Sequence, residues 1–161
     1  MQANPDIRIS KAAQSDLPVI LSFIKQLAEY EKLSDKVSAD EEILRENLFG
    51  HQPYAKVLIA WYNNKPAGIA IYFFNFSTFL GKPGLYLEDL FVNPDLRGLG
   101  IGKALFLRLA AIAKELDCGR FEWSVLNWNT PAIDFYKSMG AVPMDEWTVF
   151  RLDEQGIEKL I

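Results

Sequence analysis

An apolar strand, a tight turn and a glycine-rich helix start follow one another between Asp89 and Lys103, and this order constrains the fold most. The strand runs into Asn-Pro-Asp, and the spacing of apolar residues predicts a long amphipathic helix over 100–116. Glycines alternate through the turn, so no Cβ keeps a ligand from the backbone N–H groups. The helix start adds unpaired N–H groups and a positive dipole end. The segment therefore predicts a pyrophosphate site.

Other phosphate-binding loops are excluded by the residues themselves. A Walker loop needs Ser or Thr after Gly-Lys, whereas Ala104 follows Lys103 here, and Arg97 stands where its first glycine belongs. A dinucleotide loop needs a third glycine where Lys103 stands. A glycine-rich turn that binds nothing remains the alternative. We call the predicted site the glycine cradle; its residues are Arg97, Gly98, Leu99, Gly100, Ile101, Gly102 and Lys103.

Length and charge limit the class of protein. The chain has 161 residues, half of them hydrophobic, which is enough for one domain over residues 1–161 with a substantial core. A net charge of −4 argues against nucleic acid as a partner. The first residues contain no basic segment followed by an apolar run, so we expect no secretory signal peptide. No apolar run approaches the roughly 20 residues needed to span a bilayer. The single cysteine, Cys118, suits a reducing compartment, so we expect a cytoplasmic protein.

Hydrophobic periodicity and turn residues predict an α/β domain with a mixed sheet. Strands are expected at 6–10, 57–62, 67–74, 85–92, 120–125 and 147–152, and helices at 17–33, 38–49, 100–116 and 130–140, with a short one at the C-terminus. Ser38 is expected to open the second helix in a capping box, and Gly140 to close the fourth. Four residues of the long helix are expected to face the core: Leu105, Leu109, Ile112 and Leu116.

The pattern Arg-Gly-x-Gly-x-Gly-Lys resembles the coenzyme A motif of the GNAT acetyltransferase superfamily. Residues 127–141 resemble that family's second signature, Asn-x-x-Ala-x-x-Phe-Tyr-x-x-x-Gly. Leu87-Glu88-Asp89 and residues 27–31 are similar to the diamine acetyltransferase (spermidine/spermine-type) subfamily. Ser77-Thr78, where the polyamine branch has Asp-Pro, resembles the thialysine/ornithine branch. The resemblance implies one GNAT domain with a mixed, mostly antiparallel central sheet of six to seven strands flanked by helices.

The resemblance also implies acetyl-CoA as co-substrate and assigns residues to it. The backbone of Leu90, Phe91 and Val92 is expected to pair with the pantetheine arm, and a backbone N–H there can stabilise the oxyanion. Tyr136 matches the family's general acid, because a phenol is protonated at neutral pH and can donate to a thiolate. A tyrosine packed in the core beside Phe135 is the alternative. Asn129 is expected to bind the pantetheine arm or to cap the following helix.

A cationic amine needs an acidic site. Seven acids against three bases lie between Glu29 and Glu46, most of them expected on a solvated helix face. A carboxylate in an apolar strand is costly unless paired or functional, so Glu88 is assigned to substrate binding or water-mediated deprotonation, with a structural ion pair as the alternative. A β-bulge would let Glu88 and Asp89 meet one cation despite strand alternation. The resemblance adds Tyr30, Glu31, Ser77 and Thr78 as substrate contacts.

These residues together predict an N-acetyltransferase that moves acetyl from acetyl-CoA to a small diamine or diamino acid by direct transfer in a ternary complex. The alternatives are an acyl-CoA-binding regulatory module without turnover and a peptide or protein amine acetyltransferase. His51 and Cys118 lie outside every motif, which disfavours a covalent route, and no metal-ligand spacing is present. The resemblance further implies a homodimer joined through the late strand around Phe150.

Overall fold

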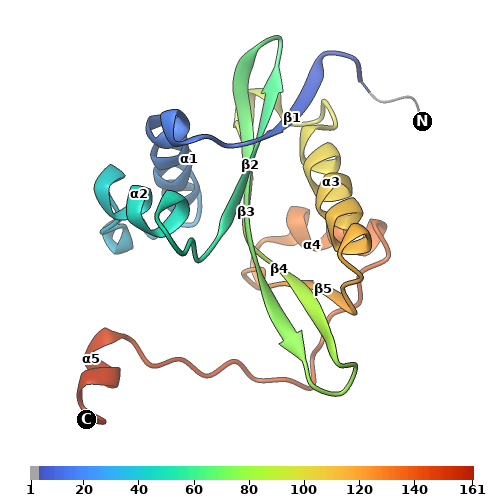
Figure 1. The fold of residues 1–161 in the computed structure, drawn as a ribbon. Helices are drawn as coiled ribbons and strands as arrows, with labels where there is room; N and C mark the ends of the chain where they lie inside the picture. Colours follow the sequence, from blue (N-terminus) through green and yellow to red (C-terminus); the bar gives the residue numbers. More distant parts are fainter. Residues whose placement is uncertain (1–3) are drawn as a thin grey trace. The chain divides into compact units, whose positions relative to one another are not determined.

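The computed structural model describes residues 4–161, which form two compact units, one ending at Ser124 and one comprising Val125–Ile161. The first unit holds the whole sheet and three α-helices (Figure 1). Its strands are β1 (Ile7–Lys11), β2 (Lys56–Tyr62), β3 (Lys65–Ser77), β4 (Lys82–Val92) and β5 (Arg120–Trp123). Its helices are α1 (Leu17–Tyr30), α2 (Glu41–Phe49) and α3 (Ile101–Glu115), with 3-10 turns η1 (Gln14–Asp16), η2 (Ser34–Lys36) and η3 (Pro94–Leu96). The second unit holds α4 (Thr130–Ser138) and α5 (Glu154–Glu158).

The sheet is mixed and mostly antiparallel, as predicted, with the strand order β1-β2-β3-β4-β5. Within residues 4–161, β4 and β5 form the one parallel pair, because α3 connects them as a crossover. The prediction of six to seven strands is wrong: residues 4–161 form five. The strand expected over 147–152 is absent from the described chain, since no neighbouring strand pairs with this segment. Val149 and Phe150 are left 79% and 92% exposed there.

Helix ends follow local signals, with one correction. The cap of α2 is Asp40, whose carboxylate accepts a hydrogen bond from the Ile43 N–H at 2.8 Å, so the predicted capping role of Ser38 is wrong. Ser38 stands two residues too early to reach the first free N–H groups. Gly140 has a φ of 89° directly after α4, which confirms the predicted left-handed termination.

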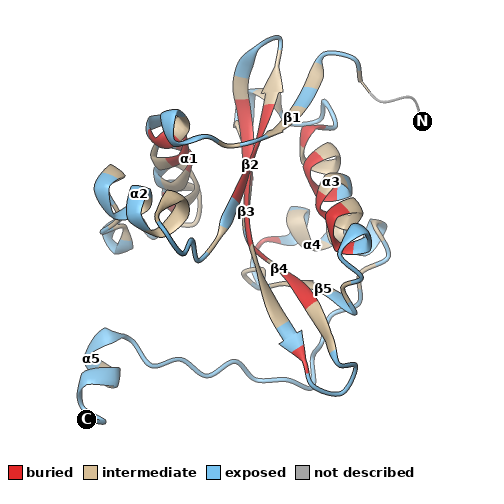
Figure 2. Ribbon diagram, in the orientation of Figure 1, coloured by how far each residue is buried: buried red, intermediate tan, exposed pale blue. Residues whose placement is uncertain are grey.

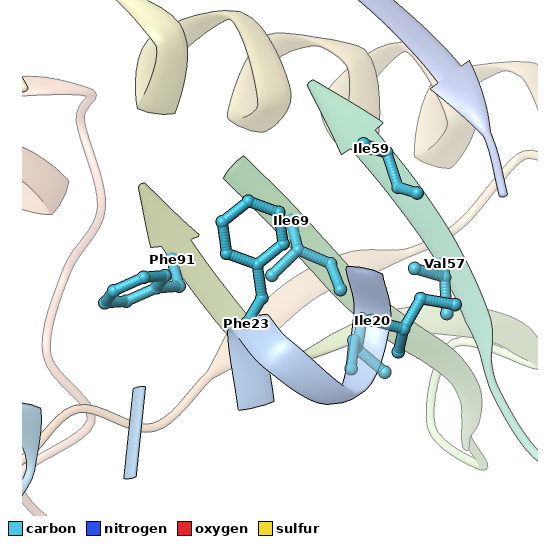
Figure 3. Close-up of a cluster of buried hydrophobic side chains, with 7 residues drawn as sticks. Ile20, Phe23, Val57, Ile59, Ile69 and Phe91 are labelled. Atoms are coloured by element: carbon cyan, nitrogen blue, oxygen red, sulfur yellow. The ribbon is translucent and has the colours of Figure 1, made fainter. Parts of the chain in front are cut away.

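Hydrophobic cores lie on both faces of the sheet, with α1 and α2 on one side and α3 on the other (Figure 1). On the α1 side, Phe23 packs against Phe91 with ring centroids 6.1 Å apart, within a cluster of isoleucines and Val57 (Figure 3). On the other side, Leu105 and Leu109 are fully buried, as predicted. Leu116 is 50% exposed, contrary to prediction, because it follows the end of α3. Figure 2 shows burial concentrated in the middle of the sheet and the helix faces that cover it.

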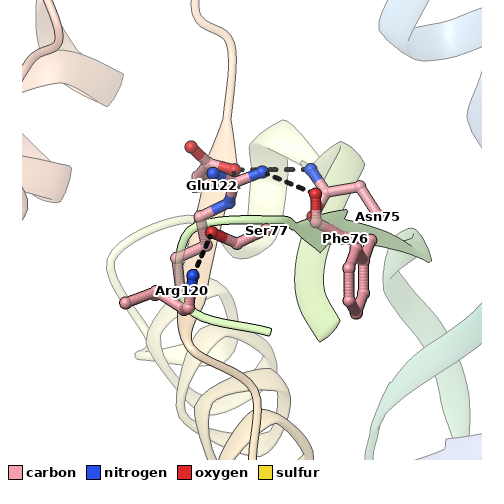
Figure 4. A network of polar contacts seen from close by, with 6 residues as sticks. Asn75, Phe76, Ser77, Arg120 and Glu122 are labelled. Atoms are coloured by element: carbon pink, nitrogen blue, oxygen red, sulfur yellow. Dashed lines mark hydrogen bonds and ion pairs between the residues drawn. The ribbon is translucent and has the colours of Figure 1, made fainter. Parts of the chain in front are cut away.

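The far end of the β3–β4 hairpin is tied to β5 by polar contacts (Figure 4). Arg120 pairs with Glu122 at 2.8 Å and donates to the Phe76 carbonyl at 3.3 Å. Asn75 donates to the same Glu122 carboxylate at 3.3 Å. These bonds hold parallel β5 beside the first half of β4 and leave the second half, which leads to the glycine cradle, without this support.

Candidate active site

The glycine cradle lies where the sequence predicts it, between the end of β4 and the start of α3. Gly98 and Gly100 both have left-handed backbones, with φ of 82° and 86°. A Cβ at either position would meet no atom within 4 Å, so space is open in front of both residues. Gly100 is the N-cap of α3, and the N–H groups that follow it lack partners within the helix. The residues present therefore fit a pyrophosphate group bound by backbone donors.

Beside the cradle, the sheet opens along one edge of β4. Strand β5 pairs with β4 only from Gly84 to Leu87, whereas β3 pairs with β4 as far as Val92. Within the described chain, residues 88–92 therefore have a strand neighbour on one side only. Their outward-facing N–H and C=O groups are available to an extended ligand, as at the edge of any sheet. This geometry fits the predicted pairing of Leu90, Phe91 and Val92 with a pantetheine arm.

Arg97 joins the cradle to the end of α1. Its Nε donates to the Val92 carbonyl at 3.2 Å, and its guanidinium carbon lies 4.7 Å from the centre of the Tyr30 ring. The same group lies 5.7 Å from the Phe91 ring centre. Such cation–π contacts stabilise by about 0.5–1 kcal/mol at exposed sites. Arg97 thus orders the strand end and Tyr30, a role that the sequence did not indicate.

The bulge that the sequence analysis required is present at Glu88. Ile71 pairs with Asp89 and Tyr72 with Leu87, so Glu88 is an extra residue in β4. Glu88 is exposed, which removes the argument that its burial demands a function. Asp89 is the carboxylate withdrawn from water: burial, together with the charges of Glu88 and Glu31, raises its pKa from 3.8 to about 6.

Glu31, Glu88 and Asp89 form what we call the acidic group. Glu31 follows the last turn of α1, and burial raises its pKa as well. Mutual repulsion between Asp89 and its two neighbours means that an ammonium ion would relieve an unfavourable charge distribution. The structure therefore brings together three of the predicted substrate residues beside the open edge of β4. Tyr30, the fourth, adjoins Glu31 and lies under Arg97.

Ser77 and Thr78 lie elsewhere, at the tip of the β3–β4 hairpin. Ser77 is 5% exposed, and its hydroxyl accepts from the Leu80 N–H at 3.3 Å, while Thr78 is exposed. Ser77 pairs with Lys82, and Asp89 stands seven positions further along β4, or about 23 Å of extended chain. Within one chain, the hairpin tip and the acidic group are thus too far apart to hold one small acceptor.

Asn129 and Tyr136 belong to the second unit. The Asn129 side chain accepts from the Ala132 N–H at 3.4 Å, so the capping role is confirmed. Tyr136 is half-buried in α4, with its ring centre 5.4 Å from that of Phe135. The structure thus contains the contact with Phe135 that is expected of a tyrosine packed in the core. The role of Tyr136 as a proton donor stays a prediction.

In residues 4–161 no helix is long and apolar enough to cross a bilayer. The same residues contain no cluster of three or more His, Cys, Asp or Glu side chains arranged to hold a metal ion.

The fold is that of an α/β protein whose cradle fits a pyrophosphate group, and comparison with known proteins identifies its family. Residues 22–141 match the Acetyltransferase (GNAT) family. The chain is 38% identical to the thialysine N-epsilon-acetyltransferase of Sus scrofa, over 96% of each chain. It is 30% identical to the L-ornithine N5-acetyltransferase of Arabidopsis thaliana, over 95% of this chain and 88% of that protein.

Among solved structures, an integron cassette protein from the mobile metagenome of V. cholerae superposes with a TM-score of 0.81. It is 31% identical and covers 98% of both chains. The chain belongs to the GNAT family and is an acetyl-CoA-dependent N-acetyltransferase, which confirms the family predicted from the glycine cradle and the second signature.

Proposed function

We propose that this enzyme transfers the acetyl group of acetyl-CoA to the side-chain amine of a small diamino acid, such as thialysine, ornithine or lysine. The observation that carries the proposal is the acidic group beside the open edge of β4, next to the cradle. A small acceptor with one ammonium near these carboxylates would lie close to a thioester extended along residues 90–92. The names of the relatives from Sus scrofa and Arabidopsis thaliana agree with this substrate class.

The cradle and the open strand edge supply binding and orientation. Backbone donors at Gly98–Lys103 are directed at the pyrophosphate, with Lys103 adding a positive charge, and residues 90–92 align the pantetheine arm as an added strand. Acetyl-CoA is a co-substrate here, and the carbonyl to be attacked gains negative charge as the amine nitrogen bonds to it. A backbone N–H of β4 that faces the open edge can stabilise that charge.

The acidic group binds the ammonium and receives its proton. With a pKa of about 6, Asp89 is largely ionised at neutral pH and basic enough to accept a proton directly or through water. Glu88, exposed on the bulge, can deliver that proton to solvent. Tyr136 then donates a proton to the departing coenzyme A thiolate. The C–N bond forms as the C–S bond breaks, and the nitrogen gives up its second proton, which restores the Tyr136 phenol through solvent, so that the ammonium ends as an amide with one proton released.

We also propose that the enzyme acts as a homodimer in the cytoplasm. Side chains of the segment after α4 remain exposed although they are large and apolar: Val142, Met144, Trp147, Val149, Phe150 and Leu152. An apolar segment of this length without a strand partner suits pairing with a second copy. A dimer would also allow Ser77 and Thr78 of one subunit to reach the acceptor of the other. The free Cys118 is compatible with a reducing compartment.

Release of free thiol, measured with a panel of acceptors, tests the proposed substrate. Wild-type kcat/KM is expected to be higher for ornithine or thialysine than for spermidine, because the hydroxyls of Ser77 and Thr78 can donate hydrogen bonds to a carboxylate without repelling it. Ser77→Asp is expected to lower this ratio. A preference for spermidine, or a ratio unmoved by Ser77→Asp, would contradict the selection mechanism, and no thiol release with any amine would support an acyl-CoA-binding module.

A further inference from the structure

A second concave site lies at the opposite end of α3 from the glycine cradle. It is a groove of about 390 Å³ between the loop after α2, strands β2 and β3, and the last turns of α3. On α3 the groove begins at Arg108, eight residues after Gly100, which separates it from the cradle by about 12 Å along the helix. Its volume falls in the range of small-molecule sites. Leu116, which sequence analysis placed in the core, is part of its wall.

A buried phenol contributes the most specific polar group. Tyr72 is 2% exposed and lines the groove, with its ring 5.9 Å from that of Phe74. Within residues 4–161 its hydroxyl makes no side-chain hydrogen bond. The ring is buried, but the hydroxyl oxygen itself is not fully withdrawn from solvent, so it can donate to a ligand acceptor in the groove. Burial raises the pKa of Tyr72, whereas the charge of Arg108 lowers it, which agrees with a guanidinium near the phenol.

The charges around the groove are mainly positive. Lys11, Lys56 and Arg108 line it, against one acid, Glu115, which pairs with Arg108 at 2.8 Å. The Lys56 ammonium lies 5.2 Å from the Phe74 ring centre. Two cations are therefore not balanced by acids of the groove, and the guanidinium has further N–H donors beyond the one bonded to Glu115. The remaining walls are apolar: Ala12, Leu48, Phe49, Pro53, Ala55, Val57, Ile112 and Leu116.

We propose that this groove binds a small molecule that carries one carboxylate on a compact apolar body. The carboxylate would accept from the Tyr72 hydroxyl and from Arg108, and the body would replace water on Phe49, Phe74 and Leu116. Both lysines add long-range attraction for an anion. Because the groove is separate from the cradle and the acidic group, such a ligand binds together with acetyl-CoA and the amine. The inference does not depend on the identity of the acceptor.

Amide-resolved NMR titration with phenylacetate, in the presence of saturating coenzyme A, tests the proposal. Phenylacetate is expected to shift the amide resonances of residues around Phe49, Tyr72 and Ile112, with a Kd of about 1 mM. Benzyl alcohol and phenethylamine, which share the ring but not the anion, are expected to bind at least about tenfold more weakly, as expected when a charge-assisted hydrogen bond is lost.

Variants distinguish binding through the polar contacts from non-specific hydrophobic binding. Tyr72→Phe is expected to leave the unfolding free energy unchanged, because no protein group bonds the hydroxyl, yet to raise the Kd for phenylacetate several-fold. Arg108→Gln is expected to raise it about tenfold or more. Arg45→Gln, an exposed change of equal charge on α2 outside the groove, is the matched control and should leave the Kd unaltered.

Three results would overturn the proposal. No shift of groove amides at about 10 mM phenylacetate would show that the groove does not bind small carboxylates. Equal affinity for benzyl alcohol would show that the phenol and guanidinium do not select an anion. Shifts of the same amides with protein concentration alone would show that a second copy of the chain fills the groove.

Discussion

Replacing Asp89 by Asn should make the enzyme more stable and less active at neutral pH. In the folded protein burial, with Glu88 and Glu31, raises the pKa of Asp89 from 3.8 to about 6. Since one pKa unit corresponds to about 1.4 kcal/mol, keeping this carboxylate ionised in the fold costs up to about 3 kcal/mol. Asn has the same shape and no charge, so Asp89→Asn should raise the unfolding free energy at pH 7.5 by up to that amount.

The pH dependence gives the sign of the effect. Below about pH 3 the wild-type carboxyl is protonated in both the folded and unfolded states, so the variant and wild type should be equally stable with respect to this group. Between about pH 4 and 6 the unfolded state loses its proton first, and wild type loses stability relative to the variant. Above about pH 7 the difference in unfolding free energy between the variant and wild type should be constant.

Urea unfolding over pH 3.5 to about 8, at one fixed protein concentration, measures this difference. Asp6→Asn, a change in an exposed turn, is the matched control and should show no comparable pH-dependent gain. In the thiol-release assay Asp89→Asn should lower kcat/KM for the amine by about 10²-fold or more, as expected for loss of a proton acceptor. A stability difference that does not change between pH 4 and 7 would refute the argument.

Three further outcomes are expected. Gly100→Val should weaken acetyl-CoA binding severely while Gly81→Val, which has the same positive φ and open surroundings, should not; equal affinities would contradict the cradle. Tyr136→Phe should preserve acetyl-CoA binding and lower kcat about 10²- to 10⁴-fold, and near-normal turnover would assign Tyr136 to packing. Light scattering should report a dimer in solution, and a monomer at assay concentration would remove the proposed shared site.

The sequence was most informative where local chemistry decides the structure. Left-handed glycines at Gly98, Gly100 and Gly140, and the cap at Asn129, follow from the conformations that these residues tolerate. Alternating apolar residues indicated most of the paired strands, because successive side chains of a strand point to opposite faces of the sheet. The segment 147–152 has an equally good strand pattern, yet pairing needs a neighbour, and the pattern does not say whether one chain provides it.

The site was harder to predict because burial and register are tertiary properties. Sequence alternation could not show which of Glu88 and Asp89 is buried, since the bulge is set by the pairing of Ile71 and Tyr72 with β4. The contact of Arg97 with Tyr30 depends on how α1 packs on the sheet. Nothing in the local sequence around Tyr72 indicated that its phenol lines a groove, because the groove forms from four separate segments.

An amide-resolved NMR titration in two steps tests the central claim most directly, namely that the cradle and the open edge of β4 hold the coenzyme beside the acidic group. Coenzyme A, added first, should shift the amides of residues 90–92 and 98–103. Ornithine, added to that complex, should then shift Glu31, Glu88 and Asp89. Shifts by coenzyme A that avoid residues 90–103, or shifts by ornithine that leave Glu31 and Asp89 unmoved, would contradict the account.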